Sequence, residues 1–183
     1  MKLSGTAAII SGGASGLGEA AARALAAAGA TVLVADRNEE RGKAVAAATG
    51  GEFVKTDVAD EASVAAAVAA AAGHGVPLRV VVNCAGIGWA ERTVNRDGSP
   101  HSLASYRKVI EINLIGTFNL MRIAAAARAR AAASPSPLAP PEMIAAVPLS
   151  SMAGAYWPAL PAWWPGQAST TRAIVGGHLY YRR

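Results

Sequence analysis

Four glycines and one carboxylate near the start of the chain form a pattern that predicts dinucleotide binding. The glycines stand at positions 12, 13, 16 and 18, between an apolar run at 6–11 and an alanine-rich stretch. Such a loop lets backbone N–H groups approach a pyrophosphate, and the following helix N-terminus adds partial positive charge. Asp36 follows a second apolar run, where an acid accepts hydrogen bonds from ribose hydroxyls and repels a 2′-phosphate. The spacing therefore predicts NAD as the cofactor in preference to NADP.

The elements that must position these residues alternate between strand-like and helix-like segments over the first 120 residues. We expect strands at 6–11, 31–35, 52–55 and 79–83, and helices at 16–28, 39–48, 61–72 and 102–131. Asn38 and Asp60 are expected to cap the second and third helices, because their side chains accept hydrogen bonds from free helical N–H groups. This alternation is typical of an α/β fold with a parallel sheet.

Composition and charge narrow the class of protein. The 183 residues are 52% hydrophobic and 16% charged, enough for one buried core without disulfides. The single cysteine, Cys84, fits a reducing compartment, so we expect a cytoplasmic protein. Residues 1–120 carry 11 basic and 11 acidic side chains, so the net charge of +5 belongs to the remaining residues. We therefore expect no nucleic-acid partner, and the absence of an eighteen-residue apolar run predicts no membrane span.

The amino-acid composition of the chain changes after about residue 128. Eight of the ten prolines and three of the four tryptophans lie between 135 and 165. We predict two regions, a dinucleotide-binding Rossmann core at 1–131 and a divergent, poorly ordered Pro/Trp-rich tail at 132–183. Within the tail, residues 143–151 look like a degraded fifth strand, because Pro148 would remove a ladder hydrogen bond.

Several motifs together resemble the short-chain dehydrogenase/reductase family. Residues 11–18 match its three-glycine cofactor loop, and Asn83-Cys84-Ala85-Gly86 is similar to its fourth-strand Asn-Asn-Ala-Gly motif. Residues 150–154, Ser-Ser-Met-Ala-Gly, look like its serine motif. The sequence of residues 91–119 looks most like the type-2 3-hydroxyacyl-CoA dehydrogenase branch of this family. The resemblance covers roughly residues 3–127.

The resemblance implies a Rossmann-type doubly wound parallel sheet, incomplete on its C-terminal side, with strands 1–5 only. It also implies a cofactor site in which the glycine loop holds the pyrophosphate, Asp36 holds the adenosine ribose, and further residues line the adenine and nicotinamide ends. The residues implied for this site are Gly12, Ser15, Gly16, Leu17, Gly18, Asp36, Asp57, Val58, Asn83, Cys84, Ala85 and Gly86. The three histidines are scattered, so no metal site is expected.

The catalytic residues implied by the resemblance are incomplete. Ser151 would orient the substrate oxygen, and Asn113 would anchor a proton-relay water. The family's Tyr-x-x-x-Lys pair is absent, since Trp164 stands thirteen residues past Ser151 and no tyrosine is followed four places on by a lysine. The chain is also some seventy residues shorter than is usual for the family. Without a proton-transfer group, we expect turnover near zero.

Three hypotheses follow for function. The first is an NAD-dependent oxidoreductase that acts on a small-molecule secondary alcohol, 3-hydroxyacyl-CoA-like or hydroxysteroid-like. The second is a non-catalytic NAD-binding fragment. The third is a frameshifted or truncated gene product, because the sequence after about residue 128 resembles GC-rich DNA read in the wrong frame. The family usually forms homo-oligomers through two long helices, of which only the one at 102–131 is recognisable.

Overall fold

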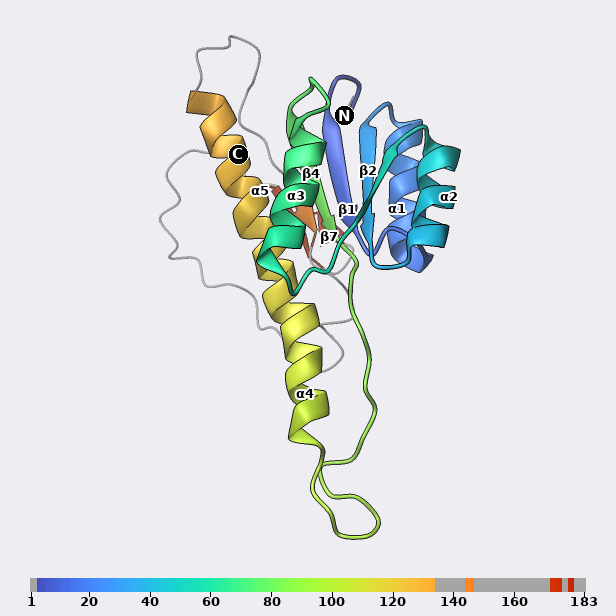
Figure 1. Ribbon diagram of the computed structural model, residues 1–183, viewed down its shortest axis with the longest axis vertical. Helices are drawn as coiled ribbons and strands as arrows, with labels where there is room; N and C mark the ends of the chain where they lie inside the picture. Colours follow the sequence, from blue (N-terminus) through green and yellow to red (C-terminus); the bar gives the residue numbers. More distant parts are fainter. Residues whose placement is uncertain (1–2, 134–143, 147–171, 176–177, 180–183) are drawn as a thin grey trace.

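A parallel sheet forms the centre of the protein. The computed structural model describes residues 3–133, 144–146, 172–175 and 178–179 (Figure 1). The strand order is β3-β2-β1-β4-β5-β6-β7, parallel as far as β6, with β7 antiparallel to β6. The strands are β1 (Ala7–Ser11), β2 (Thr31–Asp36), β3 (Glu52–Lys55), β4 (Leu78–Asn83), β5 (Ile144–Ala146), β6 (Arg172–Val175) and β7 (His178–Leu179).

The central strands are buried on both faces, which explains their nearly continuous apolar sequences. All five residues of β1 are buried, and Ile9 is paired with Leu33 of β2 and with Val81 of β4. Parallel strands covered by helices on both sides take such β-branched runs, because neither face meets water. This register brings the carboxyl ends of β1, β2 and β4 to one edge of the sheet.

Helices cover the two faces in pairs. Two helices, α1 (Gly16–Ala27) and α2 (Glu39–Thr49), pack side by side on one face, over a cluster that includes Ile10 and Val34. On the opposite face lie α3 (Glu61–Ala72) and α5 (Gly116–Ala133), over a cluster that includes Ile9 and Leu33. Figure 1 shows the two pairs on opposite sides of the sheet. The predicted caps are confirmed, because Asn38 accepts from the Arg41 N–H and Asp60 from the Ser63 N–H.

The helix expected at 102–131 contains a change of pitch. It runs as α4 (Leu103–Ile110), a π-helical segment η1 (Glu111–Ile115) and α5, and α4 reaches beyond the sheet in Figure 1. Such π segments are frequently found at functional sites. By length and composition alone, the 29 residues Leu103–Ala131 could cross a membrane. One face of α5, however, packs its buried Leu120 and Ala124 against the sheet side that α3 also covers, which accounts for the apolar sequence.

The α/β Rossmann-type fold is confirmed, and one detail of the prediction is corrected. The sheet does not stop at five strands, because β6 and β7 continue it beyond β5. The short apolar run Ala-Ile-Val at 173–175 lies beyond the proline-rich stretch and belongs to β6. No strand was predicted there, because the preceding prolines argued against a continued sheet. Of the fifth strand predicted at 143–151, the structure describes Ile144–Ala146. Pro148 and most of the tail predicted to be poorly ordered lie outside the described residues.

Candidate cofactor-binding site

A pocket of about 420 Å³ opens at the carboxyl ends of the strands. It lies where β2 and β4 flank β1, so the chain winds away from β1 in both directions, and such a crevice is the usual binding place in open α/β sheets. All the predicted cofactor residues line it except Asn83. The lining is Gly12, Ser15, Gly16, Leu17, Gly18, Ala35, Asp36, Arg37, Thr56, Asp57, Val58, Cys84, Ala85, Gly86, Ile87 and Ile112.

The glycine loop forms one end of this pocket, and it requires glycine at two positions for steric reasons. Gly12 has φ +68° and lies directly against the backbone of Cys84 and Ala85. Gly18 packs against the Gly12 carbonyl, so that any side chain there would collide with the loop backbone. Both glycines let the loop between β1 and α1 turn tightly.

The start of α1 offers free backbone donors to the pocket. Ser15 is the N-cap residue, yet its side chain makes no capping hydrogen bond. The space that a Cβ of Gly16 would enter is open, and Gly16 lines the pocket. The first N–H groups of a helix have no partner within the helix and carry partial positive charge. This cradle therefore fits a pyrophosphate, by its open space and by its donors.

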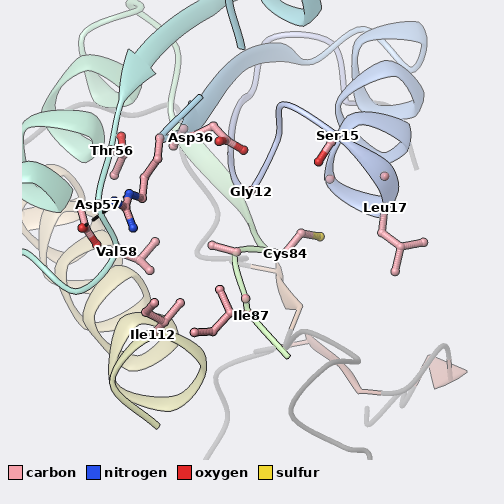
Figure 2. A pocket seen from close by; sticks show the side chains of 16 residues that line it. Gly12, Ser15, Leu17, Asp36, Thr56, Asp57, Val58, Cys84, Ile87 and Ile112 are labelled. Carbon is pink, nitrogen blue, oxygen red and sulfur yellow. Dashed lines mark ion pairs between the residues drawn. The ribbon is translucent and has the colours of Figure 1, made fainter. Parts of the chain in front are cut away.

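Asp36 fixes the geometry between the loop and the end of β2. Its Oδ2 accepts a hydrogen bond from the Ala14 N–H at 3.0 Å, and its Oδ1 accepts one from the Asn38 N–H at 2.8 Å. A carboxylate has about four acceptor sites, so two remain for ribose hydroxyls. Figure 2 shows the Asp36 side chain at the pocket rim, between the glycine loop and Asp57.

The wall formed by Asp57 and Val58 is held in place from two sides. Asp57 Oδ1 accepts from the Ala59 N–H at 3.0 Å. The Val58 carbonyl accepts from Asn119 Nδ2 of α5 at 3.0 Å, and Gly116 lies so close to Val58 that a Cβ would collide with it. Asn119 and Gly116 were not predicted as positioning residues, although both fall within the 91–119 segment of the family resemblance.

Arg37 lines the pocket as well and was not predicted. Its Nε lies 3.9 Å from Asp57 Oδ2, and the dashed line in Figure 2 marks this ion pair. The signal available in the sequence was its position, directly after Asp36 at the carboxyl end of β2. Thr56, Ile87 and Ile112 were missed for a different reason, since they belong to no recognised motif.

The two predicted asparagines lie near the pocket without lining it. Asn113 is buried in η1, where its Oδ1 accepts from the Ile87 N–H at 2.9 Å and its Nδ2 donates to the Ile87 carbonyl at 2.8 Å. It thereby holds the segment after β4, and the proton-relay role stays a prediction. Asn83 is buried at the end of β4, with its Oδ1 3.5 Å from Ser11 Oγ. Ser151 lies outside the described residues.

Cys84 lies in the middle of the pocket lining, between Gly12 and Ile87 in Figure 2. Burial raises the pKa of its thiol, because a thiolate loses solvation in these surroundings. A raised pKa disfavours the thiolate that a nucleophile needs. Within the described residues, no group of His, Cys, Asp and Glu side chains gathers as a metal site.

The chain is similar to known proteins over most of the described residues. The short chain dehydrogenase family matches residues 6–133. Human 3-hydroxyacyl-CoA dehydrogenase type-2 is 41% identical over 124 residues, which are 66% of this chain and 48% of that protein. Mitochondrial borneol dehydrogenase of Lavandula x intermedia is 33% identical over 152 residues, 74% of this chain and 58% of that protein.

Solved structures give the same picture. The crystal structure of 3-hydroxyacyl-CoA dehydrogenase type-2 from Mycobacterium avium superposes with a TM-score of 0.68 at 43% identity, covering 78% of this chain and 56% of that one. The two proteins are thus similar in both sequence and fold over the part of this chain that superposes. The chain spans about half the length of the curated relatives it matches.

The close approach at Gly18 predicts a strong effect of one methyl group. Gly18→Ala should lower the free energy of unfolding by about 1–3 kcal/mol, since the added Cβ must push the Gly12 carbonyl away. Urea denaturation measures this change. Gly88→Ala is the matched control, because a Cβ there meets nothing within 4 Å. Equal stability of the two variants would contradict the packing described here.

The raised pKa of Cys84 predicts slow alkylation. Because the chain has one cysteine, iodoacetamide labelling followed by mass spectrometry reports on this thiol alone. We expect folded protein to react more slowly than urea-unfolded protein near pH 8, and the two rates to converge as the pH rises above the thiol pKa of the folded state. Faster labelling of the folded protein at pH 8 would show an activated thiol instead.

Proposed function

Because the chain belongs to the short-chain dehydrogenase family, we propose that its pocket binds NAD for hydride transfer between the cofactor and a secondary alcohol or ketone. NAD supplies the hydride chemistry when it is bound. The residues of this chain supply the loop that holds the pyrophosphate, the carboxylate that receives the ribose and the walls that orient the two rings. The observation that carries the proposal is the fixed Asp36 carboxylate at the rim of the pocket.

The preference for NAD over NADP rests on charge. Asp36 is held by the Ala14 and Asn38 N–H groups, so its carboxylate cannot swing away from the ribose without breaking both hydrogen bonds. A ribose hydroxyl donates to such a carboxylate, whereas a 2′-phosphate would bring like charges together. The discrimination is therefore built into the backbone geometry around one side chain.

The substrate class is proposed from the relatives. Proteins named 3-hydroxyacyl-CoA dehydrogenase type-2 recur among them, in human and in Drosophila melanogaster. We propose that the substrate is a small molecule, 3-hydroxyacyl-CoA-like or hydroxysteroid-like. We also propose a cytoplasmic protein that has neither nucleic acid nor a membrane as a partner. Because the family usually forms homo-oligomers through long helices, we propose that this chain would associate through the long helix α4–η1–α5.

A non-catalytic role is the second candidate, and one sequence observation favours it. No tyrosine in the chain is followed four places on by a lysine, so the proton donor and its pKa-lowering partner are missing as a pair. Ser151 alone can orient a carbonyl oxygen but cannot transfer its proton. We propose that this chain binds the cofactor and does not turn it over.

Substitution of Asp36 tests cofactor binding and choice together. We expect the chain to bind NADH more tightly than NADPH, by fluorescence titration. Asp36→Ala should weaken NADH binding about 10- to 100-fold, since hydrogen bonds to a charged group contribute about 1.5–3 kcal/mol. It should also narrow the gap to NADPH. Glu40→Ala removes the same charge from an exposed site on α2 and should leave both affinities unchanged.

Two results would contradict this assignment. Absence of binding by folded protein to either reduced cofactor would remove the proposed function. Unchanged NADH affinity in Asp36→Ala would place the ribose elsewhere.

A steady-state assay tests the second candidate. With NADH and an acetoacetyl-CoA substrate, we expect oxidation of NADH at the background rate, because the chain lacks the Tyr-x-x-x-Lys pair. The loss of NADH absorbance measures this rate, and the parallel binding titration shows whether the cofactor is held. Turnover at rates ordinary for dehydrogenases would exclude the non-catalytic role.

A further inference from the structure

Arg122 lies outside the pocket lining, on the helical turn of α5 that follows Asn119. Its Nη2 donates to Asn119 Oδ1 at 2.7 Å and lies 2.8 Å from Glu61 Oε2. Glu61 is the first residue of α3, which packs beside α5 on the same face of the sheet. The guanidinium group therefore links the start of α3 to the amide of a buried residue on α5.

This contact determines which way the Asn119 amide points. An asparagine amide has a donor end and an acceptor end, and a half-turn about its last torsion exchanges them. A guanidinium group has donors only, so Oδ1 must face Arg122, and Nδ2 then faces the Val58 carbonyl at 3.0 Å. The reverse orientation would place donor against donor and acceptor against acceptor. That arrangement is costly because Asn119 is only 5% exposed.

The bond from Arg122 is the stronger of the two hydrogen bonds that hold this amide. Hydrogen bonds with an ionised partner are about twice as strong as neutral ones. The Arg122 and Glu61 side chains are 39% and 72% exposed, so their ion pair adds little to folding stability. Its effect is to restrain the guanidinium group beside the amide.

Val58 is the pocket residue at the end of this series of contacts. It lines the pocket within a loop between β3 and α3, where no strand ladder holds the backbone. Asn119 binds its carbonyl, and its side chain lies directly against Gly116. The position of this wall therefore depends on α5.

We propose that Arg122 is a positioning residue of the pocket, which fixes the Asn119 amide, keeps the Val58 wall in place and thereby raises the affinity for the dinucleotide. Its consequence for affinity rests on the proposed function. The positioning itself rests on the contacts among Glu61, Arg122, Asn119 and Val58.

Hydrogen exchange of the full chain without cofactor tests the positioning. Arg122→Met keeps an unbranched side chain and removes its donors, so the Asn119 amide can turn and the loop loses a restraint. We expect the N–H groups of residues 57–60 to exchange about three- to tenfold faster, because local opening becomes easier. Those of Asp57 and Ala59 report this opening, since they donate within the loop and to the start of α3.

Arg23→Met is the matched control for this measurement. It removes an arginine from an exposed ion pair with Glu19 on α1 and should leave exchange at 57–60 unchanged. Unchanged exchange at 57–60 in Arg122→Met would overturn the proposal. Equally faster exchange in β1 would assign Arg122 a merely structural role and would overturn it as well.

Titration with NADH tests the consequence for binding. Arg122→Met should weaken NADH about three- to tenfold, as expected for a residue that acts through its neighbours. Arg122→Lys keeps a charged group that can only donate, so it should retain most of the affinity. Asn119→Asp still accepts from Arg122 but offers an acceptor to the Val58 carbonyl, so it should weaken NADH at least as much as Arg122→Met.

The alternative binding results are also decisive. Equal losses in Arg122→Lys and Arg122→Met would show that the donor is not what matters, and undiminished affinity in Asn119→Asp would show the same of the amide. Either result would overturn the proposal, as would an equal loss in Arg23→Met. If the unmodified chain binds no NADH, the proposed function fails, while the exchange measurement still decides whether Arg122 positions the loop.

Discussion

The site depends on one carboxylate that joins two loops before any ligand arrives. Asp36 ends β2, and its two oxygens accept from Ala14 in the glycine loop and from Asn38 at the start of α2. The glycine loop has few side chains with which to fix itself, and its glycines carry the largest conformational entropy of any residue type. The carboxylate supplies the missing constraint, and it does so from the adjacent strand of the sheet.

The opposite side of the pocket is held by a single helix. Asn113, Gly116 and Asn119 follow one another at intervals of three along the long helix, so they share one face. Asn113 binds the backbone of Ile87 after β4, while Gly116 and Asn119 hold Val58 after β3. The helix thereby fixes two loops that no strand pairing joins. The π-helical turn at 111–115 contains Asn113, so the change of pitch sets how this side chain lies relative to the other two.

Much of this arrangement could be predicted from the sequence, because the responsible signals are local. The glycine spacing and the caps Asn38 and Asp60 act within a few residues of their own position, and the acid is recognised from its place directly after an apolar run. The missed residues act at long range. Asn119 binds a carbonyl 61 residues away, and Arg37 meets a carboxylate on a neighbouring strand. Such contacts depend on strand register or on how a helix packs against the sheet, and the hydrophobic pattern alone determines neither.

Two structural details were not predicted, the strand β6 and the π-helical turn. Proline content argues against a central strand at the prolines themselves, but it says nothing of apolar residues further along, and β6 was missed for that reason. The π-helical turn was missed because the apolar spacing of residues 102–131 fits one uninterrupted helix equally well.

The residues of the candidate cofactor pocket and those implied for proton transfer lie in different parts of the sequence. Among the described residues, those that line the pocket lie between Gly12 and Ile112. The helix residues that hold its walls extend this range only to Asn119. All of them fall within the 6–133 segment that matches the family. The serine motif follows some thirty residues later, and the expected tyrosine and lysine positions hold other residues. In the described part of the chain, the contacts that support the pocket therefore lie within this matched segment.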